Sequence, residues 1–416
     1  MARRADCVCG LANCVSNFSL RIPGFGCRCC RAAGGHDRHV FIEPIEHASL
    51  RLLFDWVVCD RHHSSSVEFV PLAQRHRATL RTQVKFKKIA VIGAGGWGTA
   101  LAVIWAKKGL PVLLWGNNKS RIADFKKESE NKIHLPGVKL SEPVSLTSEL
   151  RECADADLIV FVTPSTALRD VAGRVREFSV GANAVILSCT KGIEHGSGKR
   201  MSEILLKSFP QRPIGVLSGP NLAIEVSQEL PTATVLACTE PAFSTELQHI
   251  LGTRRFRIYT EDDVAGVELG GALKNVFAIA AGAGDGLGLG DNSKAALVTR
   301  ALAEMVRLGT KMGGDLRTFY GLSGAGDLIA TCFSRHSRNR RLGEELSRGR
   351  SLKEIISSMG TVAEGVPTAK SARECARRLE IDAPITEQVY SLLYEQKAPA
   401  QAMEELLGRD QKAERI

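Results

Sequence analysis

Residues 87–109 read KKIAVIGAGGWGTALAVIWAKKG, and this stretch decides the fold of the region that follows it. Lys88–Ile92 is a short apolar run, which is typical of a buried parallel strand. A helical pattern follows over residues 99–108, and a glycine ends it. The run PVLLWG at 111–116 then predicts a second strand, so the sequence predicts a βαβ unit.

Three glycines join this strand to its helix with the spacing G-x-G-x-x-G. Gly93 permits a tight turn, Gly95 lets the backbone approach a pyrophosphate, and Gly98 lets the helix pack close to the strand. The helix N-terminus then offers free N–H groups to phosphates. In this strand–loop–helix context the motif predicts a dinucleotide site, with Gly96 and Trp97 inside the loop.

The choice of dinucleotide depends on the residues after the second strand. An Asp or Glu there usually binds the ribose 2′-hydroxyl of NAD. This chain instead has GNNKSR at 116–121, with no acid between Gly98 and Asp124. Asn117 could bind the hydroxyl, and Lys119 or Arg121 could accept a 2′-phosphate. We therefore expect NAD or NADP as the cofactor, with NADPH at least tolerated.

Further strand-like runs continue this pattern, and after Asp262 the chain changes to Gly/Ala-rich and then charged amphipathic helical patterns. We expect an α/β fold, a Rossmann-type doubly wound sheet followed by an all-helical C-terminal domain. The predicted divisions are a leader at 1–85, a dinucleotide-binding domain at 86–261 and a helical domain at 262–416. The further predicted strands lie within 157–164, 183–192, 213–220, 232–239 and 254–260.

The composition is that of a globular protein and gives little support to a membrane-spanning or nucleic-acid-binding one. Of 416 residues, 44% are hydrophobic and 24% charged, as in ordinary globular proteins. No apolar run reaches the ~18 residues that span a bilayer, so we expect no transmembrane segment. The net charge is +10, but residues 1–85 hold 12 Lys/Arg against 7 Asp/Glu, half of the surplus. Without an aromatic–basic stripe the remainder gives little support to nucleic-acid binding.

Residues 1–85 differ from the rest. The first 35 contain Arg and Ser with one acid, which suggests a transit peptide, whereas 37–84 carry six acids. We expect a disordered leader, with an incorrect gene-model extension as the alternative. Six cysteines and two histidines within 7–39 do not have the spacing of a common zinc finger, so we expect no metal site. The five cysteines after residue 85 are scattered, as expected for reduced, buried thiols.

One lysine stands out in the second half of the chain. The stretch VELGGALKNVFAIAAGAG at 267–284 contains Lys274, the only Lys or Arg between Arg257 and Lys294. A buried lysine is costly unless it is paired or used. The alternative is a lysine whose head reaches solvent.

Taken together, the motifs resemble those of NAD(P)-dependent glycerol-3-phosphate dehydrogenases, most of all the bacterial-type enzyme also found in plastids. The resemblance covers about residues 87–408, with the motifs in the family's order. These motifs are VIGAGGWGTALA, TKGIE, LSGPNLAIEV, PTATVLA, GVELGGALKNVFAIAAG, GLSGAGDLIATC and SRNRRLG.

The resemblance implies that the protein interconverts dihydroxyacetone phosphate and sn-glycerol 3-phosphate, the precursor of glycerolipids. Reduction of a ketone needs a hydride on carbon and a proton on oxygen. Lys274 matches the family's catalytic lysine, which can donate that proton and, with a lowered pKa, take it back. Lys191 and Asp327 match the other catalytic positions. A homodimer and either a plastid stromal or a cytoplasmic location are further expectations.

The resemblance also implies two sets of contacts. Arg338 supplies a guanidinium fork that suits phosphate, and it belongs to both sets. The substrate set is Lys191, Gly219, Asn221, Lys274, Asn275, Asp327, Thr331, Ser337, Arg338 and Asn339. The cofactor set is Gly93, Gly95, Gly96, Trp97, Gly98, Asn117, Lys191, Ala223, Arg338, Val362 and Glu364. Glu364 could equally cap a helix.

Two other functions compete with this one. A 6-phosphogluconate-like or other hydroxyacid dehydrogenase also pairs a Rossmann domain with a helical domain and a catalytic lysine. The stretches at 324–328 and 337–339 argue against it. A dinucleotide sensor without catalysis would be favoured if Lys274 or Arg338 were missing, but both are present.

Overall fold

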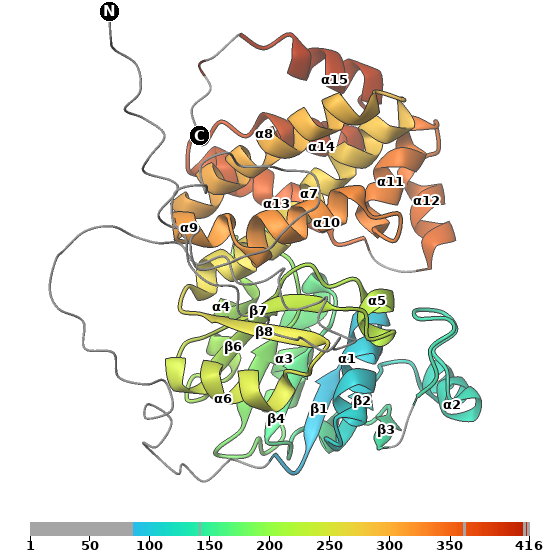
Figure 1. The fold of residues 1–416 in the computed structure, drawn as a ribbon, viewed down its shortest axis with the longest axis vertical. Coiled ribbons are helices and arrows are strands. Elements are labelled where there is room, and N and C mark those ends of the chain that lie inside the picture. Colours follow the sequence, from blue (N-terminus) through green and yellow to red (C-terminus); the bar gives the residue numbers. More distant parts are fainter. Residues whose placement is uncertain (1–85, 141–142, 361–362, 411–412, 414–416) are drawn as a thin grey trace, which may run out of the picture. The chain divides into compact units, whose positions relative to one another are not determined.

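Eight short strands form one sheet, whose arrangement is visible in the computed structural model (Figure 1). The structure describes residues 86–140, 143–360, 363–410 and 413. The strand order is β3-β2-β1-β4-β5-β6-β7-β8, and all neighbouring pairs are parallel except β6 with β7. The strands are β1 (Ile89–Ile92), β2 (Val112–Trp115), β3 (Val144–Thr147), β4 (Leu158–Phe161), β5 (Val185–Ser188), β6 (Ile214–Ser218), β7 (Thr232–Cys238) and β8 (Phe256–Glu261).

Alternate residues of the central strands belong to different hydrophobic cores. In β1, Ile89 and Val91 pack in one core, whereas Ala90 and Ile92 pack in another. Both faces of the sheet are therefore covered, as the predicted doubly wound fold requires. The chain reverses its direction of winding between β1 and β4, the point where ligands bind in such sheets.

Helices connect the strands and cover the sheet. The predicted helix after the glycine loop is present as α1, which begins inside the loop at Gly96, three residues before the predicted start. The elements of this part are α1 (Gly96–Lys107), α2 (Lys119–Glu128), η3 (Leu150–Cys153), η4 (Ser165–Ala167), α3 (Leu168–Arg176), α4 (Met201–Ser208), α5 (Ala223–Ser227) and α6 (Pro241–Leu251).

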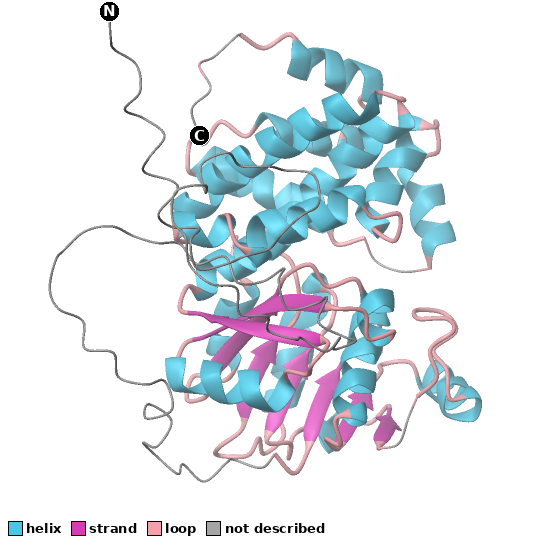
Figure 2. Cartoon of the chain, viewed as in Figure 1, coloured by secondary structure: helices cyan, strands magenta, loops and turns pink. Residues whose placement is uncertain are grey.

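After β8 ends at Glu261, every regular element in the described residues is helical (Figure 2). All of the described residues fall in one compact unit, so the domain boundary near residue 262 stays a prediction. The elements are α7 (Val264–Gly286), α8 (Gly290–Lys311), α9 (Leu316–Phe319), the π-helical η5 (Leu322–Gly326), α10 (Asp327–Phe333), α11 (Arg338–Ser347), α12 (Leu352–Met359), α13 (Gly365–Arg378), α14 (Pro384–Tyr394) and α15 (Pro399–Leu407).

The helix α7 is the core of the helical part, and 18 of its 23 residues are buried. By length and composition it could cross a membrane, contrary to the expectation that no segment could. Its most apolar window is 89% buried inside the protein, as in the core helix of a globular protein. The apolar character of α7 is therefore explained by packing.

Glycine explains how closely α11 packs on α7. A Cβ atom on Gly282 would lie 1.8 Å from the carbonyl oxygen of Arg340, and one on Gly343 would lie 2.0 Å from that of Ile279. No side chain fits at such distances, so glycines allow the two backbones to touch. The close approach holds the start of α11, with Arg338, against the helix that carries Lys274.

Two features of the sheet differ from the expectations, and two predictions concern residues that the structure does not describe. The edge strand β3 was not predicted, because three of its four residues keep some exposure and it lacks an apolar run. The antiparallel pairing of β6 and β7 was not predicted either. The leader and the cysteine–histidine group of residues 7–39 lie outside the described residues. The five later cysteines are buried and free of disulfides, as expected.

Candidate active site

The glycine loop forms a cradle at the carboxyl end of β1. Gly93 has a φ of +129°, and a Cβ atom there would lie 2.6 Å from the carbonyl oxygen of Val162. A Cβ atom on Gly98 would lie 2.0 Å from the Gly93 carbonyl oxygen. Gly95 differs, because a Cβ atom there would meet nothing within 4 Å. Gly93 and Gly98 are thus needed because the surrounding backbone leaves no room for a side chain, whereas Gly95 borders open space.

This open space fits a dinucleotide pyrophosphate. Gly95 is the N-cap residue of α1 and offers no side chain to the first N–H groups of the helix. Those donors are available to an anion at Gly95. Trp97 packs against Phe256, with ring centroids 6.3 Å apart, so its predicted cofactor contact stays a prediction.

A segment that the sequence analysis missed borders this loop. The side-chain amide of Asn131 donates to the Ala94 carbonyl, at 3.0 Å, and to the Thr99 hydroxyl, at 2.8 Å. The His134 carbonyl oxygen would lie 2.6 Å from a Cβ atom on Gly96. Burial and the nearby charges of Arg121 and Arg338 lower the pKa of His134. No strand or glycine motif marks this segment, NKIHLPG at 131–137, and the turn-forming pair Pro136-Gly137 is its only local signal.

The residues after β2 are mostly exposed, including Asn117. Asn118 caps α2, accepting from the backbone N–H of Arg121 at 3.0 Å. Lys119 forms an ion pair with Glu149 at 2.8 Å. Glu149 follows β3, which pairs with β2, so tertiary structure brings an acid to the place where the sequence shows none. The Arg121 guanidinium has no hydrogen bond or ion pair to any described residue, so it is free to meet a phosphate.

The three predicted catalytic residues are in contact, because Lys274 and Lys191 both pair with the carboxylate of Asp327. Asp327, at the start of α10, is 1% exposed. Its Oδ1 lies 3.0 Å from the Nζ of Lys274, and its Oδ2 accepts from the Nζ of Lys191 at 2.5 Å. Lys274 also donates to the Thr331 hydroxyl at 2.7 Å. This hydroxyl in turn donates to Asp327 at 3.2 Å. The second bond of Lys191 goes to the Gly219 carbonyl at 3.0 Å.

Lys274 is 8% exposed, so its head does not lie in solvent. Burial lowers its pKa to about 8, and the charge of Lys191 adds to this effect, whereas Asp327 opposes it. A lysine with this pKa exists in both protonation states near neutral pH. Nearby Cys332 is buried, which raises the pKa of its thiol to about 12 and keeps it protonated.

Arg338 lies at the N-terminus of α11, after the N-cap residue Ser337, whose hydroxyl accepts from the backbone N–H of Arg340. The Arg338 side chain has no hydrogen bond or ion pair to any described residue. Arg338 keeps exposed surface, yet the protein around it desolvates the guanidinium and lowers its pKa, while Glu364 opposes this effect. An unpaired guanidinium at a helix N-terminus is suited to an anion.

Asn339 and Asn275 are connected to each other. The Asn339 amide donates to the Asn275 oxygen at 2.8 Å, and its oxygen accepts from the backbone N–H of Gly365 at 2.9 Å. Both side chains are buried and join α7, α11 and α13. In this arrangement their amides tie helices together, and their predicted contacts with substrate stay a prediction.

Glu364 is the N-cap residue of α13, but its side chain makes no capping hydrogen bond to that helix. Its carboxylate accepts from the Ser165 hydroxyl at 2.6 Å and from the Ser165 backbone N–H at 3.3 Å. Burial raises its pKa. Because Ser165 follows β4, this bond connects the helical part to the edge of the sheet where the glycine loop lies. Val362, the neighbouring predicted contact, lies outside the described residues.

The segment after β6 completes the predicted set. Gly219 has a φ of +154°, and its carbonyl receives Lys191. The Asn221 oxygen accepts from the Thr234 hydroxyl at 2.9 Å, whereas its amide nitrogen is buried without a partner among the described residues. Ala223 begins α5 and packs against the same buried cluster as Trp97. The unpaired amide of Asn221 therefore remains available to a ligand.

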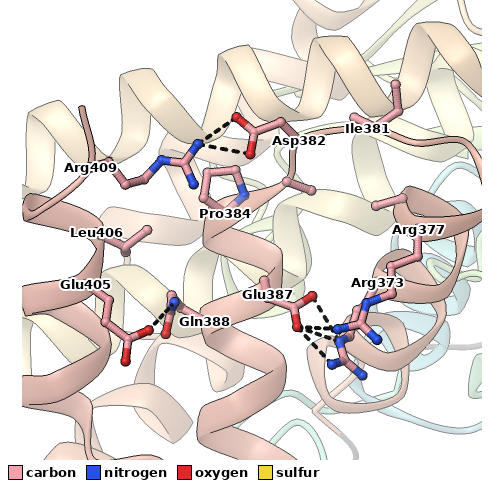
Figure 3. Close-up of a pocket in the computed structure, with 12 residues that line it drawn as sticks. Arg373, Arg377, Ile381, Asp382, Pro384, Glu387, Gln388, Glu405, Leu406 and Arg409 are labelled. Atoms are coloured by element: carbon pink, nitrogen blue, oxygen red, sulfur yellow. Dashed lines mark hydrogen bonds and ion pairs between the residues drawn. The ribbon is translucent and has the colours of Figure 1, made fainter. Parts of the chain in front are cut away.

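A separate surface pocket of about 240 Å³ lies among α13, α14 and α15 (Figure 3). Its lining includes none of the predicted site residues. Its arginines are paired, Arg373 and Arg377 with Glu387 and Arg409 with Asp382. We do not assign the reaction to this pocket, because its cations are already neutralised.

Comparison with known proteins gives consistent matches to one family. A family model for the N-terminus of NAD-dependent glycerol-3-phosphate dehydrogenase matches residues 88–244, and one for its C-terminus matches 263–404. Glycerol-3-phosphate dehydrogenase (NAD(P)+) of Geobacter sulfurreducens is 46% identical over 333 residues, covering 79% of this chain and 99% of that protein. The enzyme of the same name from Chlorobium chlorochromatii is 45% identical over 331 residues, with the same coverage.

Solved structures agree with the sequence relatives. The crystal structure of glycerol-3-phosphate dehydrogenase from Coxiella burnetii has a TM-score of 0.75 and 40% identity. It covers 78% of this chain and 99% of the other. The yeast enzyme has a TM-score of 0.65 at 28% identity, covering 76% of this chain and 98% of the other.

Proposed function

Because the chain belongs to the NAD-dependent glycerol-3-phosphate dehydrogenase family, we propose that it interconverts dihydroxyacetone phosphate and sn-glycerol 3-phosphate with NAD(P). The observation that carries this proposal is the buried Lys274, which shares Asp327 with Lys191. The product would supply the glycerol backbone of glycerolipids.

The cofactor set supports the binding of a dinucleotide. The open space at Gly95 and the free N–H groups of α1 suit its pyrophosphate. When bound, NAD(P)H supplies the hydride that this chemistry needs. Glu364 and Arg338 would meet the cofactor from the helical part of the chain.

Lys274 acts as the acid in ketone reduction. Thr331 and Asp327 occupy two of its three N–H donors, which leaves one for the substrate carbonyl oxygen. The ammonium stabilises the developing alkoxide and then donates a proton to it. In the reverse direction the neutral amine accepts the proton from the alcohol, which a pKa of about 8 makes accessible.

Asp327 and Lys191 position this group and add charge. The carboxylate lies between two ammonium groups and fixes the direction of both. Lys191 keeps one donor beyond its bonds to Asp327 and Gly219, and we assign that donor to substrate. Arg338 would bind the substrate phosphate, because its guanidinium has no partner among the described residues.

The test is direct. Purified full-length chain is mixed with NADH or NADPH, and absorbance of the reduced dinucleotide is followed on adding dihydroxyacetone phosphate. Turnover with either supports the proposal, and the ratio of rates measures the cofactor preference. In the reverse assay, reduction of NAD+ or NADP+ by 6-phosphogluconate or another hydroxyacid at millimolar concentration, with none by sn-glycerol 3-phosphate, would favour the related dehydrogenases. Tight dinucleotide binding without any turnover would favour a sensor.

Location and assembly are further parts of the proposal. The Arg- and Ser-containing first 35 residues support import into a plastid, with a cytoplasmic location as the alternative. A fluorescent protein fused after residue 85 should enter plastids, and a diffuse cytoplasmic signal would contradict import. We also propose a homodimer, which light scattering of the purified chain would test.

A further inference from the structure

Glu268 is a buried carboxylate on α7 that the proposed mechanism does not use. It is 6% exposed. One of its oxygens accepts from the backbone N–H of Ser202 at 2.8 Å. The other accepts from the Ser202 hydroxyl and from Arg200, whose Nη1 lies 3.3 Å away. Both carboxylate oxygens thus accept hydrogen bonds from donors at the start of α4.

These bonds cap α4 from another part of the chain. Arg200 is the N-cap residue of α4, and its own backbone N–H bonds to Glu203 at 2.8 Å. The N–H of Ser202 is one of the free donors of a helix N-terminus, which a carboxylate satisfies especially well. Burial raises the pKa of Glu268, whereas its bonds from Ser202 and the charge of Arg200 lower it. Glu268 therefore fastens α7 to α4 by hydrogen bonds to both of its carboxylate oxygens.

The segment before α4 carries Lys191. At its beginning Lys191 bonds to Asp327 and Gly219, and at its end Arg200 and Ser202 bond to Glu268. Between these points Ile193 pairs with Arg200 and packs in the same core as α7. The segment from 191 to 202 is thus held at both ends to groups around α7.

Lys274 lies six residues after Glu268 on the same helix, which corresponds to about 9 Å along its axis. Between them, a Cβ atom on Gly271 would lie 2.2 Å from the Ser218 hydroxyl and 3.5 Å from the Lys191 Cδ. The Ser218 hydroxyl leaves no room for a side chain at Gly271, and the Lys191 side chain would lie in van der Waals contact with a Cβ atom there. A shift of the helix would therefore change the distance between the two ammonium groups.

We propose that Glu268 is a positioning residue, which sets the separation of Lys274 and Lys191 by holding α7 to the start of α4. This inference rests on the proposed function. The charged or titratable groups around Lys274 are Asp327, Lys191 and the thiol of Cys332, and those around Glu268 are Arg200 and Glu203. A change in geometry at Lys274 alters its interaction with all of its neighbours.

The chain offers a matched control in Glu304 on α8. It is 0% exposed and accepts from the backbone N–H groups of Ile385, at 2.9 Å, and Thr386, at 2.8 Å, and from the Thr386 hydroxyl at 2.6 Å. It thus caps α14 as Glu268 caps α4. The helix α14 carries none of the proposed site residues. Glu304→Gln should reproduce the loss of a buried cap without moving the two lysines.

The experiment compares Glu268→Gln with Glu304→Gln in the full-length chain. Glutamine replaces one acceptor oxygen by an N–H₂ group that faces other donors, so both variants should unfold at lower temperature. Glu268→Gln should lower kcat for dihydroxyacetone phosphate by about 10- to 100-fold, since small misplacements have such effects. Its kcat–pH profile should shift, and its dinucleotide Kd should stay within about twofold of wild type. Glu304→Gln should keep kcat within about twofold and leave the profile unchanged.

Equal kcat and equal pH profiles in the two variants would overturn the positioning role. Should Glu268→Gln fail to fold, Ser202→Ala removes one of the same bonds without changing the charge. It should shift the profile in the same direction with a smaller loss of kcat, and a wild-type profile would overturn the inference. Absence of turnover in the wild type would refute the proposed function and the positioning role together. An active wild type with unchanged kcat and pH profile in Glu268→Gln would refute the positioning role alone.

Discussion

Replacing Lys274 with methionine should stabilise the folded protein and abolish most of its turnover. The folded chain holds this ammonium in a buried site, where its pKa falls from 10.5 to about 8. A fall of this size means that charging Lys274 is harder in the folded than in the unfolded chain by about 3 kcal/mol. Methionine has a similar shape and no charge, so it removes this unfavourable term while removing the proton donor.

The sign of the pH dependence follows from the two pKa values. At pH 7 Lys274 is charged in both states, so the wild type bears the full penalty. Between pH 8 and 10.5 the folded state releases its proton while the unfolded state keeps it, so wild-type stability rises with pH in this window. The advantage of Lys274→Met should be about 3 kcal/mol at pH 7 and shrink to about 1 kcal/mol at pH 9.5.

Urea unfolding at the two pH values measures this difference, and dinucleotide binding by fluorescence confirms that the variant is folded. Lys353→Met serves as the control, because Lys353 is exposed on α12 and should change neither stability nor turnover. Equal unfolding free energies of Lys274→Met and wild type at pH 7 would refute the reasoning about burial. Near-normal turnover in Lys274→Met would refute its role as acid and base.

The remaining predictions concern the binding groups. Arg338→Ala should raise the Michaelis constant for dihydroxyacetone phosphate by about 10- to 100-fold, the value of a charged hydrogen bond, and initial rates would contradict this if the constant stayed the same. Gly95→Ala should keep the wild-type melting temperature but bind NADH more weakly, because its Cβ meets nothing in the chain. Gly98→Ala should instead melt earlier, since its Cβ would lie 2.0 Å from the Gly93 carbonyl oxygen; the opposite order of melting would refute this. Arg121→Ala should reduce turnover with NADPH more than with NADH, and an unchanged ratio would exclude Arg121 from 2′-phosphate binding.

Local patterns explain why seven of the eight strands could be predicted. A central parallel strand is buried on both faces and must be apolar throughout, as in β1 and β4. The edge strand β3 carries Ser145 on its exposed side and has no such pattern. The direction of β7 depends on how the chain returns to the sheet, which is not a property of its own residues.

The electrostatic environment of the site was less predictable. Sequence shows that no acid follows β2, but it does not show that Glu149 lies beside Lys119. It suggests that Lys274 is buried, but its pKa depends on Lys191 and Asp327, which lie 83 and 53 residues away along the chain. Glu268 and His134 gave no signal, because their partners are also distant in the sequence.

The sequence by itself determined the elements whose cause is local: the βαβ unit, the three glycines that a pyrophosphate needs, and the apolar helix with a single cation. Only the tertiary structure decided which charges meet. The packing of α7 and α10 against the carboxyl ends of the strands brings Lys274 and Lys191 to one carboxylate and leaves Arg338 without a partner among the described residues. Electrostatic energy depends on distance and burial rather than on position along the chain, so these contacts exist only in the folded molecule.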